Sequence, residues 1–573
     1  MQRVLFIYPE PANYYFHKGR YPMGIGYLSG VLKENGHQTK LFKSVDYFDF
    51  DKYVKIVEEF KPTIIGISLT ENSFNIVKNC IKKIKLNSEA FLIVGGVYPT
   101  LYPDELLKID GIDAVCLGEG EFALLELCEK FDNKSDYTNI ESIYFKTKDG
   151  EIIRNRIRNL VEDLNSLPFA DRDIFDYKDS CEYDGKYMVT MAGRGCPFNC
   201  FYCANHSLKN IYPNKNCYVR FRSPQNVIKE LKFLLKKFDW INFFIFDDDI
   251  LTLDKKWLME FSGYYKKEIK LPYICNVQVK TLDEDIITLL KESNCIQVNI
   301  GIETGNEKIR KEVLNKSFTN EEIKNVCKKI SNKEIKIYTF NMCGIPGETV
   351  EDCKMTYKIN ADIKADYCQV SFFYPYKGTR INEKIKEELA NKKIESLTYL
   401  EEALIPSTYN CEFAVFNFAK IVNELKNSKI TMERIEELLT KEEFSKEERK
   451  EFNIPYKNKN NKKIEKILIV RSSRSEHFQF AKRRIKKRFS DIEITVLLTK
   501  QMPEEKEVKN YRPELNYNNY EEEHFKNLDE YDLIIVLINN FERKGYEKII
   551  PYLTLHYEEK VYGYLPNGWL IKL

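Results

Sequence analysis

The chain has 573 residues, which is enough for several domains, and it carries 89 Lys and Arg against 87 Asp and Glu. This near balance of charge gives no overall attraction for nucleic acid or for an anionic membrane surface. No stretch approaches the roughly 20 apolar residues that span a bilayer, and the first residues, MQRVLFIYPEPANYY, lack the pattern of a signal peptide. We therefore expect a cytoplasmic protein with no transmembrane segment, in which the 15 cysteines are reduced.

The first 135 residues alternate apolar strands with helices. Strands are expected at RVLFIYP, TKLFKSV, TIIGISLT, FLIVGGVYP and DAVCLGEGE. Continuous apolar strands separated by helices predict a parallel, doubly wound sheet. The bridging segment 136–186 is expected to hold a hairpin with its turn at Asp149 and Gly150.

A second alternating series fills residues 187–385. Its strands are expected at YMVTMAGRG, NFFIFDDDI, YICNVQVK, IQVNIGIET, KIYTFNMCGIP and YCQVSFFYP. Six β/α units are too few for a closed eight-fold barrel and predict a partial (β/α)6 barrel. Residues 386–458 indicate a charged helical extension, and 459–573 a small C-terminal α/β domain to which we assign no role. The predicted fold class is therefore α/β in all three domains.

Three cysteines lie within eight residues in the loop after the first of these strands, GRGCPFNCFYC: Cys196, Cys200 and Cys203. A glycine, a proline and an asparagine interrupt any apolar run here, which argues against buried structural cysteines. Zinc usually takes four nitrogen or sulfur ligands, and with His206 as the fourth a zinc site is one alternative. The other is an iron–sulfur cluster held by three thiolates, which leaves one iron open to a cofactor or substrate.

CPFNCFYC resembles the CxxxCxxC loop of the radical S-adenosylmethionine (SAM) enzymes. The resemblance implies that Cys196, Cys200 and Cys203 hold a [4Fe-4S] cluster whose open iron is chelated by SAM. It also implies that one-electron reduction cleaves SAM to methionine and a 5′-deoxyadenosyl radical. Tyr202, the aromatic residue before the last cysteine, is implied to lie against the adenine.

Later strand ends resemble the same family in the family's order. They read IFDDDI, NIGIETG, CGIPGET and, at the closing strand, FYPYKGT. The resemblance implies that SAM is contacted by Asp247, Asp248, Glu303, Gly344 and Gly347. A carboxylate opposite the SAM ammonium is a charge-assisted pairing.

Other acidic side chains in these loops have simpler interpretations. In the run of three aspartates that ends with Asp249, one or two are expected only to cap a helix or face solvent. A buried Glu303 needs a partner, which we expect to be a ribose, an ammonium group or Lys316. Glu348 is expected to cap the helix that follows it.

The N-terminal domain resembles the cobalamin (B12)-binding domain of B12-dependent radical SAM enzymes in PMGIGYLSGVLKENGH, GISLT, VGGVYPT and CLGEGE. The resemblance implies that cobalamin is bound by Ser68, Leu69, Gly95, Gly96, Gly118 and Glu119. These loops end strands, at the edge where open α/β sheets bind ligands, and glycines there let a bulky nucleotide tail approach the backbone. The alternative is a flavodoxin-like domain without a cofactor.

One position departs from other cobalamin proteins. Mutases and methionine synthase carry D-x-H-x-x-G, whose histidine ligates cobalt from below. Here His17 has no Asp two residues before it and no Gly three residues after it. We therefore expect no histidine ligand on the lower face of cobalt, and we expect His17 to be an ordinary loop residue.

These features predict a cobalamin-dependent radical SAM enzyme that methylates an unactivated carbon of a small molecule or lipid. The resemblance implies a flavodoxin- or ferredoxin-type reductant and anaerobic chemistry, with no nucleic-acid partner. Two alternatives stay open: a non-methylating radical reaction, such as oxidative cyclisation or rearrangement, and a B12-binding regulator with a vestigial cluster. The sequence does not identify the substrate, the catalytic residue that acts on it, or the oligomeric state.

Overall fold

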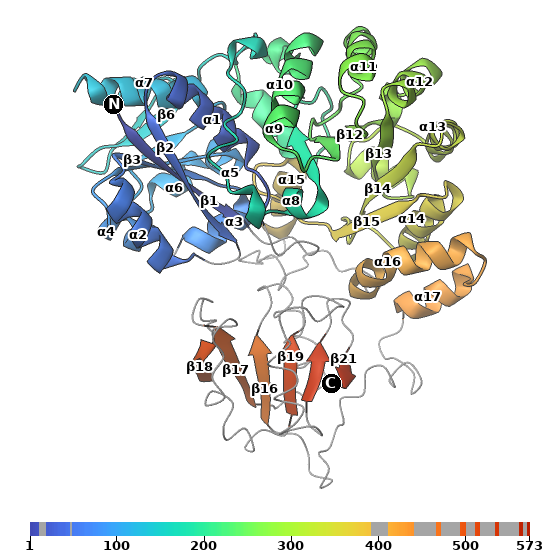
Figure 1. The fold of residues 1–573 in the computed structure, drawn as a ribbon. Coiled ribbons are helices and arrows are strands. Elements are labelled where there is room, and N and C mark those ends of the chain that lie inside the picture. The colour runs from blue at the N-terminus through green and yellow to red at the C-terminus, as the bar shows by residue number, and fades with distance from the viewer. Residues whose placement is uncertain are drawn as a thin grey trace. The chain divides into compact units, whose positions relative to one another are not determined.

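The computed structural model describes residues 1–10, 19–45, 48–78, 80–390 and 411–440, and six strands beyond residue 465 (Figure 1). The chain divides into two compact units, each described here by itself. The first comprises Met1–Pro11, Lys18–Glu395 and Phe418–Glu436, and the second Ala12–His17, Ser396–Asn417 and Glu437–Leu573. None of the described helices is long and apolar enough to cross a bilayer.

The first unit begins with a seven-stranded sheet in the order β2-β1-β3-β4-β5-β6-β7. Its strands are β1 (Arg3–Glu10), β2 (Gln38–Val45), β3 (Ile64–Ser68), β4 (Phe91–Gly95), β5 (Ala114–Cys116), β6 (Ile143–Lys146) and β7 (Ile152–Arg154). The first five pair in parallel, and the antiparallel hairpin β6–β7 extends the sheet beyond β5.

Helices cover both faces of this sheet (Figure 1). They are α1 (Met23–Glu34), α2 (Phe50–Phe60), α3 (Glu71–Val77), α4 (Ile81–Leu86), α5 (Val97–Leu101), α6 (Pro103–Leu107) and α7 (Glu121–Asp132). Alternate strand residues point to opposite faces, so Phe6 packs against α1 and α7, whereas Leu5 packs against α2 to α6. The predicted doubly wound sheet is confirmed.

A second, six-stranded sheet follows in the order β15-β14-β13-β12-β11-β8, with every pairing parallel. Its strands are β8 (Tyr187–Thr190), β11 (Phe243–Phe246), β12 (Tyr273–Val277), β13 (Cys295–Glu303), β14 (Lys336–Cys343) and β15 (Tyr367–Phe372). Because β8 and β15 do not pair with each other in this described sheet, the barrel is open, as six β/α units predict.

The helices of the barrel are α8 (Cys181–Gly185), α9 (Ala204–Ile211), α10 (Pro224–Lys237), α11 (Lys255–Glu268), α12 (Glu284–Glu292), α13 (Asn320–Asn332), α14 (Val350–Asp362) and α15 (Arg380–Ala390). Ser223 caps α10 by accepting from the Asn226 amide, and Pro224 stands at its first position. Buried strand residues such as Phe244 and Val298 pack outward against these helices. The alternate residues of each strand therefore face the inside of the open barrel.

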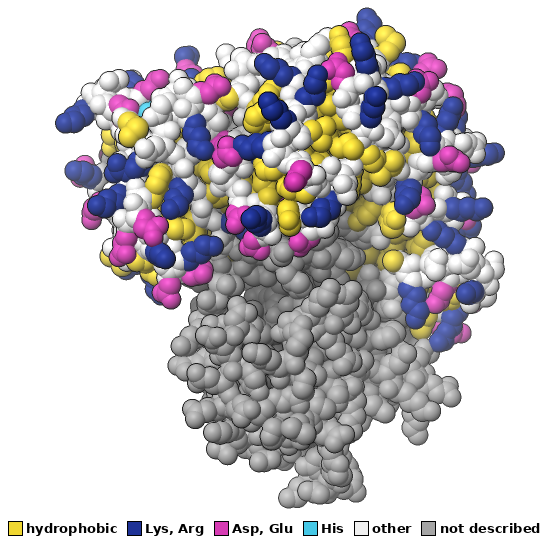
Figure 2. Space-filling view, viewed as in Figure 1, with side chains coloured by type: hydrophobic (Ala, Val, Ile, Leu, Met, Phe, Trp, Pro, Cys, Tyr) yellow, Lys and Arg dark blue, Asp and Glu magenta, His cyan; other side chains and the backbone are white. Residues whose placement is uncertain are grey.

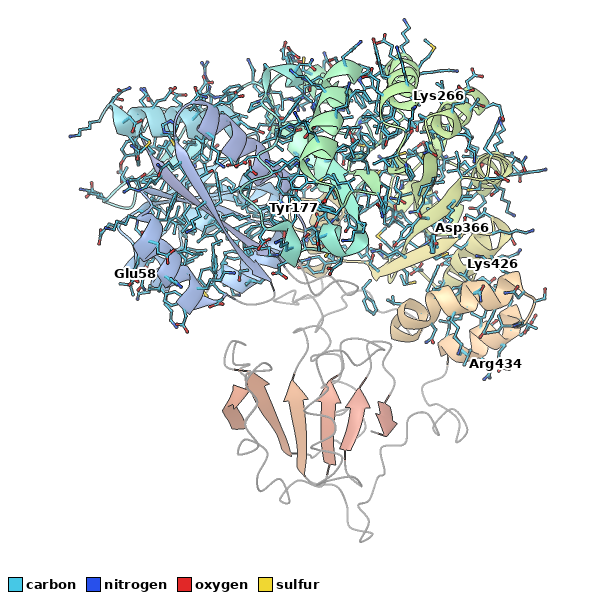
Figure 3. The ribbon with its side chains drawn as sticks, in the orientation of Figure 1. Glu58, Tyr177, Lys266, Asp366, Lys426 and Arg434 are labelled. Atoms are coloured by element: carbon cyan, nitrogen blue, oxygen red, sulfur yellow. The ribbon has the colours of Figure 1, made fainter. Side chains whose placement is uncertain are left out.

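Helices α16 (Cys411–Lys426) and α17 (Met432–Thr440) follow the barrel. The ring of Phe418 packs 4.7 Å from that of Tyr357 on α14. The Lys426 ammonium, labelled in Figure 3, donates to the Ala365 carbonyl beside Asp366. These contacts attach this part of the helical extension to the last β/α unit.

The second unit contains a six-stranded sheet in the order β18-β17-β16-β19-β20-β21. Its strands are β16 (Lys466–Arg471), β17 (Glu493–Thr499), β18 (Asn510–Leu515), β19 (Leu533–Leu537), β20 (Val561–Tyr564) and β21 (Leu570–Lys572). All pairings are parallel except that of β20 with β21. The segments between these strands lie outside the described residues.

Candidate active site

The three-cysteine loop lies at the carboxyl end of β8 and leads into α9, which begins directly after Cys203. It follows the short strand β9 (Gly193–Arg194), which pairs with β10 (Arg220–Phe221). Gly195 adopts φ +90°, and a side chain there would collide with the Tyr218 carbonyl. Phe201 fixes the loop on its other side: its amide donates to the Leu314 carbonyl at 3.1 Å, and its carbonyl accepts from the Ile381 amide at 3.0 Å.

The donor set of this loop suits an iron–sulfur cluster. All three cysteines are free and partly buried, and this burial raises the pKa of Cys196 to about 12 and also raises the pKa of Cys200 and Cys203. Soft thiolate donors select iron–sulfur clusters or zinc. Within the described residues, no three His, Cys, Asp or Glu side chains are grouped to hold one metal ion. A multi-iron cluster does not need that convergence, because each cysteine binds a different iron.

His206 was the fourth ligand of the zinc alternative. Its Nδ1 lies 3.2 Å from Asn199 Oδ1, and its Nε2 lies 3.5 Å from the Asn210 amide nitrogen. The ring is therefore engaged by two asparagine side chains, and the structure gives no support to a mononuclear zinc site here.

The three aspartates after β11 have different partners. Asp247 forms an ion pair with Arg20 at 3.9 Å. Asp248 is buried and accepts from the amides of Ala192 at 2.9 Å and Gly193 at 2.5 Å, so it fixes the backbone between β8 and β9. Burial raises the pKa of Asp248 to about 7.

Asp249 faces the helix that follows the cysteine loop. It accepts from Asn205 Nδ2 at 2.8 Å, and Asn205 also accepts from the Tyr218 hydroxyl at 2.9 Å. The aspartate run therefore supports the cysteine loop from two sides, through the backbone at Asp248 and through α9 at Asp249.

Glu303 ends β13 as a buried carboxylate with two partners. It accepts from the Tyr202 hydroxyl at 2.9 Å and from the Lys316 ammonium at 2.9 Å. Of the three partners expected from the sequence, Lys316 is the one that the protein itself supplies. Glu303 has φ +69°, a conformation that costs a non-glycine residue energy and that clusters at functional sites.

Arg310 holds the segment between Glu303 and Lys316 in place, a role that the sequence does not predict. It is fully buried in the π-helical turn Ile309–Val313, and its guanidinium donates to the carbonyls of Thr304 at 3.1 Å and Phe318 at 3.0 Å. Burial lowers its pKa to about 10. In the sequence it is one of several charged residues in GNEKIRKEV, with no signal to separate it from a solvated face.

The CGIPGET loop after β14 turns on two glycines. Gly344 has φ +86° and Gly347 has φ +77°. Glu348 does not cap the following helix as predicted, because its Oε2 accepts from the amides of Gly344 at 2.6 Å and Ile345 at 3.2 Å. The cap of α14 is Thr349, which forms a capping box with Asp352.

The loops after β3 and β4 lie together, as predicted for the cobalamin edge. The Leu69 amide, next to the half-buried Ser68, donates to the Gly95 carbonyl at 2.8 Å. Gly96 has φ +106°, and a Cβ there would lie 2.7 Å from the Leu69 carbonyl oxygen. Only glycine fits this position, where the backbones of two loops meet.

The loop after β5 contacts the barrel. A side chain on Gly118 would collide with the Tyr212 hydroxyl, to which the Glu119 amide donates at 3.0 Å. The Glu119 carboxylate accepts from Arg194 at 2.9 Å and from Arg220 at 2.8 Å. Although burial opposes it, hydrogen bonding to Arg220 and the charge of Arg194 hold the pKa of Glu119 below its usual value.

Arg194 also pairs with Glu121 at 2.7 Å. We refer to Glu119, Glu121, Arg194 and Arg220 as the charge cluster. Arg194 stands two residues before Cys196, so the charge cluster joins the loop after β5 directly to the strand that carries the cysteine loop. No pattern in the sequence predicts a role for either arginine, and the resemblance assigns Glu119 to cobalamin. His17 lies outside the described residues.

Comparisons with known proteins agree with this geometry. Residues 191–359 match the Radical SAM superfamily and residues 20–128 match the B12 binding domain. The radical SAM methyltransferase TsrM of Kitasatospora setae, solved with cobalamin and a [4Fe-4S] cluster, superposes with a TM-score of 0.55 at 17% identity over 68% of this chain and 75% of that chain. The cobalamin-dependent SAM radical enzyme OxsB superposes with a TM-score of 0.57 at 15% identity over 71% and 64%.

Alignments with related sequences span a larger share of this chain than the two domain matches do. An uncharacterised methyltransferase of Pyrococcus horikoshii is 28% identical over 63% of this chain and 78% of its own. The cytidylyl-2-hydroxyethylphosphonate methyltransferase of Streptomyces wedmorensis is 25% identical over 65% and 79%. The anaerobic magnesium-protoporphyrin IX monomethyl ester cyclase of Rubrivivax gelatinosus is 24% identical over 70% and 74%.

The fold and the cysteine loop therefore define a radical SAM enzyme, with SAM and a [4Fe-4S] cluster as its cofactors. The N-terminal sheet adds a B12-binding domain, so cobalamin is the third cofactor, and the chain carries a B12-binding domain and a radical SAM domain together.

Proposed function

We propose that the protein transfers a methyl group from SAM, through cobalamin, to an unactivated carbon of a small molecule or lipid. The observation that carries this proposal is the charge cluster, in which Glu119 of the loop after β5 accepts from Arg194 on β9, the strand of the cysteine loop, at 2.9 Å and from Arg220 on its partner β10 at 2.8 Å. The charge cluster thus holds a loop of the B12-binding domain against the strand that leads into the three-cysteine loop. This arrangement suits an enzyme in which cobalamin and the iron–sulfur cluster serve one reaction. Two of the relatives named above are methyltransferases.

We assign the cofactors to residues as follows. Cys196, Cys200 and Cys203 hold the [4Fe-4S] cluster; Tyr202, Asp247, Asp248, Glu303, Gly344 and Gly347 form the SAM site; and Ser68, Leu69, Gly95, Gly96, Gly118 and Glu119 form the cobalamin edge. When bound, these cofactors supply reductive cleavage of SAM and a transferable methyl group.

The chain's own residues position these groups. Asp248 holds the backbone that leads into the cysteine loop, and the ion pair with Lys316 holds the Glu303 carboxylate beside the Tyr202 hydroxyl. Glu119 acts on the cobalamin edge through its loop, because its carboxylate is bound by the two arginines of the barrel. A flavodoxin- or ferredoxin-type protein supplies the electrons in this proposal, under anaerobic conditions in the cytoplasm.

A test of methyl transfer does not require the substrate. The full-length protein, reconstituted anaerobically with iron, sulfide and hydroxocobalamin, is reduced with titanium(III) citrate and given SAM labelled in its methyl group. We expect S-adenosylhomocysteine to form and an equal amount of label to appear in the corrinoid fraction, with 5′-deoxyadenosine from a second, reductive cleavage of SAM.

The other outcomes separate the alternatives. Formation of 5′-deoxyadenosine without S-adenosylhomocysteine would contradict methyl transfer and favour a non-methylating reaction such as oxidative cyclisation; the Rubrivivax relative is named as a cyclase. A B12-binding regulator with a vestigial cluster would form neither product.

Replacing Gly96 with alanine tests the cobalamin edge. An alanine at φ +106° would be strained and would place its Cβ 2.7 Å from the Leu69 carbonyl oxygen. We expect corrinoid affinity to fall about five- to thirtyfold, which corresponds to roughly 1–2 kcal/mol for a left-handed residue, measured by equilibrium dialysis with hydroxocobalamin. The matched control is Gly24→Ala in α1, where a Cβ would meet no atom within 4 Å. Equal affinity in the two variants would count against this edge as the corrinoid site.

A further inference from the structure

The side chains that face the inside of the open barrel limit the chemical class of substrate that could bind there. On β8 and β11 this side is closed, because Val189 and Ile245 pack with Cys181 of α8 and with Met23. On β12 to β15 the inward residues remain partly exposed. In the region of these strands, Figure 2 shows hydrophobic side chains gathered in a patch, with charged side chains mostly around it. We use the name inner face for seven of the inward residues of β12 to β15: Asn276, Gln297, Asn299, Tyr338, Phe340, Tyr367 and Gln369.

Amide side chains form one side of the inner face. Asn299 Nδ2 donates to Asn276 Oδ1 at 3.0 Å, and Gln297 Nε2 donates to Asn299 Oδ1 at 2.9 Å. Asn276 is held in turn by the Asp248 carbonyl, to which its Nδ2 donates at 2.9 Å. The row of amides is thus fixed to the strand end that supports the cysteine loop. It presents neutral donors and acceptors in a set orientation.

Aromatic rings form the other side. The ring of Tyr338 lies 5.3 Å from that of Phe340 and 6.1 Å from that of Tyr367. The Tyr338 hydroxyl donates to Gln369 Oε1 at 2.9 Å, which orients the amide of Gln369. Among the hydrogen bonds of the described residues, none is donated by Gln369 Nε2. This group can therefore donate to a ligand that rests on the rings.

Charged groups lie only at the ends of this inward-facing row in the described strands. Lys336 stands at the exposed start of β14, next to the Tyr367 ring. Asp247 and Glu303 lie at the carboxyl ends of the barrel strands, which we call the mouth of the barrel. Asp247 is paired with Arg20, and Glu303 is paired with Lys316. A phosphate or carboxylate placed over the middle of the inner face would lose water without gaining a cationic partner, which is costly.

We propose that the inner face binds an uncharged, flat aromatic or conjugated part of the substrate that carries carbonyl- or amide-type hydrogen-bonding groups. This inference rests on the proposed function, because it takes the ligand of the inner face to be the substrate of the radical reaction. Flat rings stack on aromatic side chains, and the fixed amides give the hydrogen bonds that set which edge of the ligand faces the mouth. Phosphorylated substrates are disfavoured at this surface.

A matched pair of probes tests the inference: 2-naphthamide and 2-naphthyl phosphate share one ring system and differ in charge. Binding to the full-length, cluster-reconstituted protein is measured by saturation-transfer difference NMR. We expect the amide to bind and the phosphate to bind at least about tenfold more weakly. Phe340→Ala should weaken the amide about three- to tenfold, the range expected for one aromatic pair. Phe233→Ala, which removes an exposed ring from the outer helix α10, should leave it unchanged.

A second variant tests charge without removing a ring. Gln369→Lys should raise the affinity for the phosphate and lower that for the amide, because it places a cation at the partly exposed edge of the inner face. The inference is overturned if the amide fails to bind, if the phosphate binds as tightly as the amide, or if Phe340→Ala behaves like Phe233→Ala. Probe binding requires no SAM turnover, so failure of the proposed methyl transfer would leave this result intact and could be told apart from it.

Discussion

Cys200→Ala should abolish the iron–sulfur cluster and, with it, all cleavage of SAM. Cys200 directly precedes Phe201, whose backbone is held on both sides, and two thiolates in a loop fixed in this way cannot replace the third. Anaerobically reconstituted protein should lose its brown colour, its iron and its acid-labile sulfide. Formation of 5′-deoxyadenosine should fall to that of a sample without protein.

The control for this result is Cys217→Ala. Cys217 is also a free, partly buried cysteine, but it lies outside the loop and contacts the side chains of Asn214 and Glu162. This variant should keep the colour, the iron and the SAM cleavage of the unaltered protein. A Cys200→Ala protein with full iron and sulfide would contradict the assignment of the loop.

Glu119→Ala should destabilise the first unit by about 3–5 kcal/mol, because it leaves the charges of Arg194 and Arg220 without their shared carboxylate. Arg220 has only 7% of its side chain exposed, so water replaces the lost partner poorly. Urea denaturation followed by circular dichroism measures the loss. The same variant should weaken corrinoid binding, because the loop after β5 keeps only the Glu121–Arg194 pair at this contact and loses both ion pairs of Glu119.

Two further variants make this prediction specific. Glu119→Gln keeps the shape and one oxygen acceptor of the side chain. It should therefore lower the free energy of unfolding by less than Glu119→Ala does. Lys255→Ala removes a solvent-exposed partner of Asp283 and Asp285, and it should leave the urea midpoint unchanged. Equal midpoints for Glu119→Ala and Lys255→Ala would show that the charge cluster does not hold the two domains together.

The sequence by itself determined the local features of this protein. Unbroken apolar runs such as RVLFIYP predicted parallel strands covered on both faces, and β1 is such a strand. The spacing of Cys196, Cys200 and Cys203 predicted a metal-binding loop, which its resemblance to the radical SAM loop assigns to a [4Fe-4S] cluster, and Ser223–Pro224 predicted the start of α10. These features can be predicted because the period of hydrophobic residues, the capping residues and the spacing of the ligands each depend only on residues that are close together in the sequence.

The tertiary structure alone decided what each acidic side chain does. Glu119 and Arg220 are 101 residues apart in sequence and form two hydrogen bonds in the fold. Glu348 turns back to the amides of its own loop instead of capping α14, and Arg310 looks like a surface residue until the carbonyls around it are in place. Charged partners are chosen by distance in space after the strands have been assembled, and no local pattern of residues encodes that distance.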